Sequence, residues 1–426
     1  MTTSSDDTRR AIETVWRIES ARLIGGLARV VKDLGVAEDL AQEALLVALE
    51  QWPESGVPQN PGAWLMTTAK RRAIDRLRRQ RMLDRKHEEL ERAPTQDVST
   101  TLESALERAT EASADEVDDD LLRLILVSCH PILATEARVA LTLRLLGGLT
   151  TEEIARAFLA PEPTIQQRIV RAKRTLGEAK VPFEVPRGAD LTARVSSVLE
   201  VIYLVFNEGY SATKGDDWVR PALCDEAVRL GRILAAHLPD EAELLGLVAL
   251  MELQNSRSRA RVTSTGEPIL LTDQDRGRWD QLLIRRGLAA LERAETLQRP
   301  LGPYTLQAAI AACHARAKSA EQTDWVRIVA LYDALAEITQ SPIVELNRAV
   351  ALGMAFGPEA GLDLVDQLKD EPSLSSYHLL PSVRGDLLAK LGRNAEARAE
   401  FERAAFLAKN RRERELLMAR AKACGR

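Results

Sequence analysis

Side chains that hydrogen-bond to base edges are concentrated in one predicted helix, residues 164–176. Apolar residues recur there at helical spacing, which predicts one face packed on a core. The opposite face carries glutamine and arginine, which pair with adenine and guanine in the major groove, and each good bidentate pair contributes about 1–3 kcal/mol. The residues predicted to read base edges of duplex DNA are Thr164, Gln167, Arg168, Arg171 and Arg174. The predicted core positions are Ile165, Ile169, Ala172 and Leu176.

A shorter helix over residues 150–158 is expected to position this reading helix. Thr150 and Glu153 have the spacing of a capping box, which starts a helix. Residues 159–163 contain Pro161 and Pro163 and are predicted to form the turn. The cap, the turn and the opposed apolar and basic faces are typical of a helix-turn-helix that binds DNA. An ordinary helical hairpin is the alternative.

A second basic segment lies between residues 61 and 86. Its cations would meet phosphates, and counterion release would then make binding salt-dependent, with a slope of roughly 0.9 per phosphate on duplex DNA. Asp75 lies four residues from both Arg71 and Arg79, so it either braces them or accepts a hydrogen bond from a cytosine amino group. Many basic helices are only solvated faces, so this segment alone is weak evidence. The candidate nucleic-acid contacts are Lys70, Arg71, Arg72, Asp75, Arg76, Arg78 and Arg79.

An acid and amide cluster lies on the predicted helix over residues 37–52. Asp39, Gln42 and Glu43 share one face, while Leu40, Ala44 and Val47 form an apolar stripe on another. This arrangement suits docking onto a basic helical partner. A solvated helix face is the alternative interpretation.

The composition indicates a globular, all-α protein of two to four domains. The chain has 426 residues, of which 45% are hydrophobic and 28% charged. The formal net charge of −5 hides a basic stretch at 64–86 followed by an acidic one up to residue 120. The four scattered cysteines and the absence of a secretory or membrane-spanning pattern predict a cytoplasmic protein without disulfides.

Motifs of enzymes and metal sites are absent from the sequence. We find no phosphate-binding glycine loop, no nucleophile elbow and no metal-ligand spacing among the five histidines. We therefore expect no catalytic activity, no cofactor and no metal. The polar clusters at 207–210 and 273–276, near Trp279, either form a pocket or, as we favour, connect helices by hydrogen bonds.

The sequence divides into five segments. Residues 1–86 are predicted to form a helical unit, 87–120 an acidic linker, 121–183 a second helical unit, 184–300 a helical middle region and 301–426 helical repeats. Predicted helix starts near residues 304, 324, 342, 358, 377 and 394 recur in pairs at about 34–38 residues, the range of helix-turn-helix solenoids. An irregular α-bundle is the alternative for this part.

These segments, taken in order, resemble an extracytoplasmic-function (ECF) RNA polymerase sigma factor. Residues 38–44 resemble the helix of region 2.2 that contacts the clamp helices of the polymerase β′ subunit, with Asp39, Gln42 and Glu43 at the contact positions. Residues 61–79 resemble regions 2.3 and 2.4, which open the −10 element, although Lys70, Arg71 and Arg72 depart from the common pattern, so the base-contacting residue is not assigned. Residues 121–180 resemble the domain that reads the −35 element and lies near the β flap.

The resemblance continues into the C-terminal half. Segments at 204–210, 246–251, 273–279, 323–325 and 341–349 are similar to the ECF subgroup with a C-terminal domain resembling tetratricopeptide (TPR) repeats. The resemblance implies a sigma factor that directs core polymerase to promoters and is regulated by its own extension, which could bind a protein partner. The alternatives are a helix-turn-helix regulator that recruits polymerase without being a sigma subunit, and a TPR-type scaffold.

Overall fold

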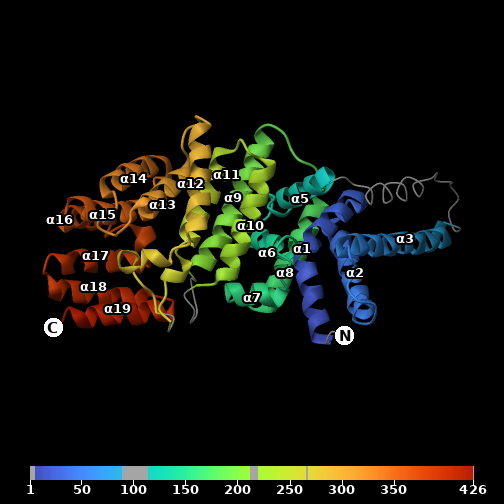
Figure 1. The fold of residues 1–426 in the computed structure, drawn as a ribbon, viewed down its shortest axis with the longest axis horizontal. Helices are drawn as coiled ribbons and strands as arrows, with labels where there is room; N and C mark the ends of the chain where they lie inside the picture. The colour runs from blue at the N-terminus through green and yellow to red at the C-terminus, as the bar shows by residue number, and fades with distance from the viewer. Residues whose placement is uncertain (1–4, 89–113, 212–218, 265–266, 426) are drawn as a thin grey trace. The chain divides into compact units, whose positions relative to one another are not determined.

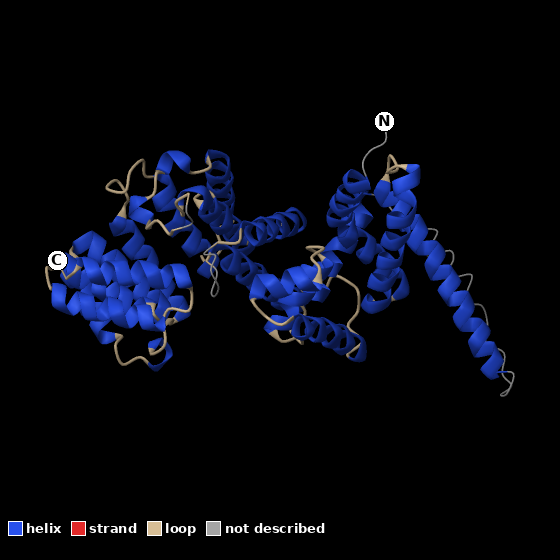
Figure 2. Ribbon diagram, turned by 90° about the horizontal axis from the view of Figure 1, so that it is seen from below, coloured by secondary structure: helices blue, strands red, loops and turns tan. Residues whose placement is uncertain are grey.

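The protein is built from α-helices. The computed structural model describes residues 5–88, 114–211, 219–264 and 267–425. Helices and loops make up these residues, and none of them forms a strand, which confirms the predicted all-α class (Figure 2). The chain forms two compact units, Met1–Val201 and Ile202–Arg426 (Figure 1). None of the helices in the described ranges is long and apolar enough to cross a membrane.

Unit 1 begins with three helices, which we call helix group 1. They are α1 (Ser5–Val31), α2 (Leu34–Ser55) and α3 (Pro61–Glu88). The predicted stripe Leu40, Ala44 and Val47 is buried, because these side chains face the neighbouring helices. The indole rings of Trp52 and Trp64 meet edge to face at 5.2 Å, which holds α3 against α2.

Helix group 2 follows and consists of four helices. They are α5 (Ala114–Ser128), α6 (Thr135–Leu145), α7 (Thr151–Phe158) and α8 (Glu162–Glu178). Helix α5 begins inside the predicted linker 87–120, because residues 114–120 are helical. Acidic side chains in a first turn interact favourably with the positive end of the helix dipole, so an acidic run can begin a helix. Residues 89–113 of the predicted linker lie outside the described residues.

Helix α9 (Ala189–Tyr210) begins in unit 1, where its first turns are hydrogen-bonded to helix group 2. The Ser197 hydroxyl donates to the carbonyl oxygen of Cys129 at 2.5 Å and accepts from the Arg138 guanidinium. Arg138 also forms an ion pair with Glu200 at 3.0 Å. These bonds give a terminal nitrogen of the buried guanidinium its partners and so offset part of the cost of burying its charge.

Unit 2 contains the remaining helices. The first three are α10 (Pro221–His237), α11 (Ala242–Asn255) and α12 (Gln281–Thr296), with short 3₁₀ turns η1 (Ser258–Ala260), η2 (Leu271–Asp273) and η3 (Arg276–Arg278) between α11 and α12. Arg276 donates to the Ala317 carbonyl at 2.8 Å, and Arg257 donates to the Tyr210 hydroxyl at 2.8 Å. The polar clusters therefore connect segments by hydrogen bonds, as we favoured.

The C-terminal half of unit 2 is a succession of helices in which each packs on the next (Figure 1). They are α13 (Pro303–Arg316), α14 (Trp325–Thr339), α15 (Pro342–Phe356), α16 (Pro358–Gln367), η4 (Pro372–Leu374), α17 (Leu379–Lys390), α18 (Asn394–Leu407) and α19 (Arg411–Ala423). Gly392 turns the chain between α17 and α18 with φ 74°, a backbone conformation that favours glycine. The predicted helix starts lie within two residues of those observed, while the TPR assignment itself stays a prediction.

Candidate functional site

The helix-turn-helix is formed by α7 and α8. Thr150 Oγ1 accepts a hydrogen bond from the Glu153 amide at 3.1 Å, and Glu153 Oε2 accepts from the Thr150 amide at 2.8 Å, so the predicted capping box is present. The turn is shorter than expected, because α8 begins at Glu162 rather than at Thr164. Pro163 fits inside the first turn of α8, where an amide hydrogen has no helical partner to lose.

The two faces of α8 are arranged as the periodicity predicts. Ile165, Ile169, Ala172 and Leu176 are buried, whereas Gln167, Arg171 and Arg174 are exposed. Thr164 and Arg168 are half-buried at the edges of the exposed face. Arg174 pairs with Glu178 at 2.7 Å on the same helix, an exposed pair that a nucleic-acid phosphate or base can displace.

The acidic face of α2 differs from the expectation at one residue that sequence reasoning missed. Asp39 is exposed and Gln42 and Glu43 are half-buried, but Glu38 is only 4% exposed. The Glu38 carboxylate accepts from Arg144 Nε at 2.8 Å and also pairs with Lys173 of α8. The sequence held one signal for the burial of Glu38. This residue lies one helical turn before Ala41, which is buried, so both belong to the packed side of the helix.

The basic face of α3 is described only in part. Arg71, Arg72 and Asp75 are exposed, as a nucleic-acid contact requires. Lys70 is 6% exposed and engaged with the protein, so it does not share that face in this structure. It follows Ala69 directly and shares the packed side of the helix with it. The side chains of Arg76, Arg78 and Arg79 lie outside the described residues.

Helix groups 1 and 2 are in contact through a second charged cluster around Asp120. This residue is 2% exposed and pairs with Arg29 of α1 at 3.2 Å and with Arg123 of α5 at 2.6 Å. Burial raises the pKa of the Asp120 carboxyl, and the two arginines only partly oppose this effect. The cluster joins α1 to α5 next to Gly25, where an added Cβ would lie 3.0 Å from the Asp120 carbonyl oxygen.

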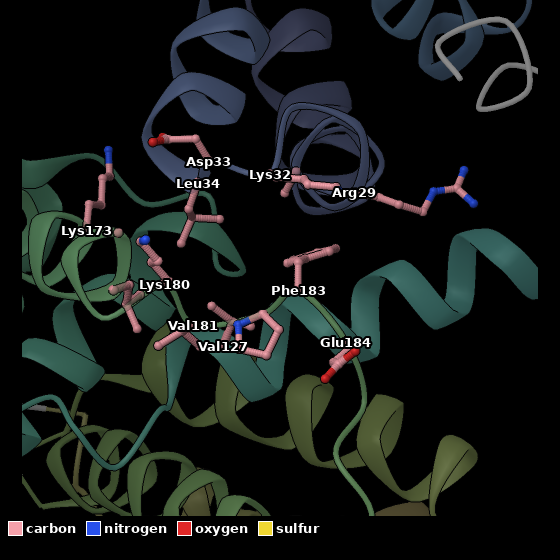
Figure 3. Close-up of a pocket in the computed structure, with 14 residues that line it drawn as sticks. Arg29, Lys32, Asp33, Leu34, Val127, Lys173, Lys180, Val181, Phe183 and Glu184 are labelled. Carbon is pink, nitrogen blue, oxygen red and sulfur yellow. The ribbon is translucent and has the colours of Figure 1, made fainter. Parts of the chain in front are cut away.

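Two cavities lie between the groups. One, of about 470 Å³, is lined by the end of α1, the start of α2, the end of α8 and the connector 181–184. Figure 3 shows Phe183 of that connector facing Arg29 and Lys32, with Lys173 and Lys180 on the other side. The other cavity, of about 600 Å³, is lined by α1, α2 and residues Arg144, Gly148 and Thr150. Within the described residues, no group of three or more His, Cys, Asp or Glu side chains could hold a metal ion.

Three protein families match successive parts of the chain. Sigma-70 region 2 matches residues 18–82, within helix group 1. Sigma-70 region 4 matches residues 123–176, within helix group 2. A family of unknown function (DUF6596) matches residues 194–295, which begin in α9 and end in α12. The two sigma-70 matches cover the helices that carry the acidic face, the basic face and the helix-turn-helix.

Relatives of this chain include both long and short proteins. An uncharacterized protein of Rhizobium meliloti is 44% identical over 387 residues, covering 91% of this chain and 89% of the relative. The probable ECF RNA polymerase sigma factor SigI of Mycobacterium tuberculosis is 28% identical over 175 residues, covering 41% of this chain and 57% of the relative.

The ECF RNA polymerase sigma factor SigK of Mycobacterium ulcerans is 31% identical over 159 residues, covering 36% of this chain and 78% of the relative. No solved structure matches the chain. Both sigma-70 regions are present in order, and SigK aligns over most of its own length. The chain therefore belongs to the family of ECF RNA polymerase sigma factors, which act in transcription initiation with core polymerase at promoter DNA.

Proposed function

We propose that this sigma factor contacts polymerase and promoter through three surfaces and is regulated by its own extension. In this proposal Asp39, Gln42 and Glu43 of α2 bind the clamp helices of β′, and helix group 2 binds near the β flap. The exposed residues Arg71, Arg72 and Asp75 of α3, continued by Arg76, Arg78 and Arg79, hold the melted −10 strand. Thr164, Gln167, Arg168, Arg171 and Arg174 of α8 read the −35 element.

The opposed faces of α8 carry this proposal. A buried apolar stripe fixes the helix on α6 and α7, while glutamine and arginine side chains stand exposed on the other side. A rigidly held helix that presents these side chains suits direct readout in the major groove. Two weak contacts with DNA gain joint affinity when one chain carries both, because the second binding event becomes intramolecular.

Promoter-specific transcription with purified core polymerase tests the sigma function. We expect initiation from cognate promoters with the full chain, and strong loss when Asp39 and Glu43 are both changed to alanine. Arg156→Ala is the control, because Arg156 is exposed on α7 and pairs only with its helix neighbour Glu152 at 2.7 Å among the contacts that are described. Failure to initiate at any candidate promoter would favour the regulator that recruits polymerase without being a sigma subunit.

Regulation by the extension needs a full-length test, because α9 is bonded to helix group 2. Phe401 and Phe406 lie on the same helix, α18, but Phe401 is 1% exposed and Phe406 is 88% exposed. Phe401→Ala removes a core ring, which costs about 3–5 kcal/mol and loosens α17–α19, whereas Phe406→Ala leaves that core intact. We expect Phe401→Ala, and not Phe406→Ala, to change promoter-specific transcription per molecule of protein. A fall makes the extension a required part and a rise makes it an inhibitor, while equal activities contradict regulation by these helices.

A further inference from the structure

The contact between helix groups 1 and 2 is centred on a buried carboxylate. Glu38 of α2 meets Arg144 at the end of α6 and Lys173 in α8, and Gln42 donates to Glu38 at 3.1 Å. Both cations come from helix group 2, whereas the carboxylate and the amide come from helix group 1. Among the described residues, the cations that neutralise the Glu38 carboxylate therefore all come from the other helix group.

This contact lies beside the face of α2 that we assign to polymerase docking, and Asp39 on that face stays exposed. Gln42 lines the 600 Å³ cavity together with Arg144, Gly148 and Thr150 of helix group 2. In the same arrangement Gln167, Arg171 and Arg174 of α8 remain exposed. Helix group 2 thus shields part of the proposed docking face and leaves its own DNA-reading face open.

Two features of this contact favour the separation of helix groups 1 and 2. Two pockets of about 470 and 600 Å³, both open to solvent, flank the Glu38 cluster, so water reaches the contact from either side. Charged groups lose hydration when they are buried, and their mutual attraction offsets little more than that loss. Because Glu38, Arg144 and Lys173 all regain water on opening, a competing protein surface can displace the contact.

The connector to the extension takes part in this arrangement. Residues 181–184 line the smaller cavity opposite α1, and Phe183 faces Arg29 and Lys32 (Figure 3). Arg29 is one of the two arginines that pair with Asp120 of α5. The segment that leads to α9 therefore lies against both helix groups at the contact.

We propose that Glu38 is the central residue of an autoinhibitory contact, in which helix group 2 shields the Gln42 side of the docking face of α2 until core polymerase displaces it. This inference rests on the proposed docking role of α2. It adds a closed resting form that limits polymerase binding rather than DNA recognition, and it assigns a function to Glu38, Arg144 and Lys173 as a set.

The first experiment opens the contact. Arg144→Ala and Glu38→Gln each remove one charge from the cluster, and Arg156→Ala is the matched control on α7. Fluorescent labels are attached at residues 59 and 162, which are both exposed, in a chain that carries Cys424→Ser to remove the half-buried cysteine. We expect the distance between the two labels to increase in the two opening variants and not in the control. We also expect about tenfold tighter binding to core polymerase, equivalent to about 1.4 kcal/mol.

The second experiment closes the contact covalently. A Cβ built at Gly25 lies 3.4 Å from the Asp120 Cβ, close to the distance of about 3.5–4.5 Å found in disulfides. In the full chain carrying Gly25→Cys and Asp120→Cys, oxidation should weaken core binding at least about tenfold, and a reductant should restore it, while each single variant is insensitive to redox state. Equal core affinity of the oxidised and reduced forms overturns the proposal.

The two proposals fail in different ways. If the wild-type and reduced chains bind core polymerase, but the opening variants bind no better and the disulfide has no effect, the autoinhibitory contact is wrong and the docking proposal stands. If no form binds core polymerase while the label distance still lengthens in Arg144→Ala, the docking role of α2 is wrong, and with it the inhibition.

Discussion

At the scale of single residues, burial decides which side chains are available for function. The face of α8 that we propose reads DNA is exposed, whereas Glu38 and Lys70 are buried although both carry charge. His314 in unit 2 is another titratable side chain that is buried, at 8% exposed. The centre of its ring lies 5.2 Å from that of Trp325. Burial, followed by the positive charges of Arg257 and Arg276, lowers the pKa of His314 to about 4.

This histidine makes the stability of the protein sensitive to acid. The unfolded chain binds a proton at a pKa of about 6.5, and the folded chain does so only near 4, so stability falls as pH drops through this window. We expect His314→Phe, which keeps an aromatic ring beside Trp325, to lose about 2 kcal/mol less than the wild type between pH 7 and pH 5. Urea unfolding at both pH values measures this difference, and parallel pH profiles would contradict it.

Arg171 provides a residue-scale test of DNA reading. Arg171→Ala should weaken binding to the preferred −35 sequence by about 1–3 kcal/mol and reduce discrimination at one base pair, because a bidentate contact with guanine is lost. Holoenzyme affinity for promoter duplexes that differ at single −35 positions measures both effects. A uniform loss across all sequences would instead show a phosphate contact, with a salt dependence reduced by roughly one unit of slope.

At the scale of helices, close approach depends on glycine at particular crossings. A Cβ on Gly246 of α11 would lie 2.7 Å from the Thr305 Cα in α13, so the two backbones are in contact there. A Cβ on Gly177 near the end of α8 would meet nothing within 4 Å. Replacing glycine by alanine is therefore expected to lower the stability of the chain at Gly246 and to raise it at Gly177.

The matched pair Gly246→Ala and Gly177→Ala tests this packing. The former should destabilise the chain by about 1–3 kcal/mol because α13 must move away. The latter should stabilise it by roughly 0.5–1 kcal/mol, because alanine restricts the unfolded chain more than glycine does. Denaturant midpoints of the two variants give the comparison, and equal shifts would show that the α11–α13 crossing is not tightly packed.

Sequence patterns predicted the helices better than the contacts between them. Period and caps placed the core of α8, the Thr150 cap and the helix starts of the C-terminal half, because these depend on local spacing. They missed the early start of α5, since an acidic run was taken as a linker although it suits a helix N-terminus. They also missed Glu38, whose partners Arg144 and Lys173 lie more than 100 residues further along the chain and are set by tertiary packing.

At the scale of the molecule, hydrogen bonds join the first turns of α9 to helix group 2. Ser197 is buried, bonded to Arg138 and to the Cys129 carbonyl, whereas its neighbour Ser196 is exposed and bonds only within its own helix, to Thr192, among described contacts. Ser197→Ala should cost about 1–3 kcal/mol because it leaves buried polar groups without a partner. Ser196→Ala should change the unfolding midpoint little, and equal effects would argue against a structural joint.

The bonds of Arg138 also bear on how such proteins can be recombined. Its guanidinium reaches Ser197 and Glu200, which lie beyond the connector and beyond the sigma-70 region 4 match at 123–176. A chimera joined at residue 187 would pair this buried cation with whatever helix the donor extension supplies. Exchange of extensions between sigma factors should therefore succeed only when the crossover lies after Glu200, so that the first turns of α9 stay with helix group 2.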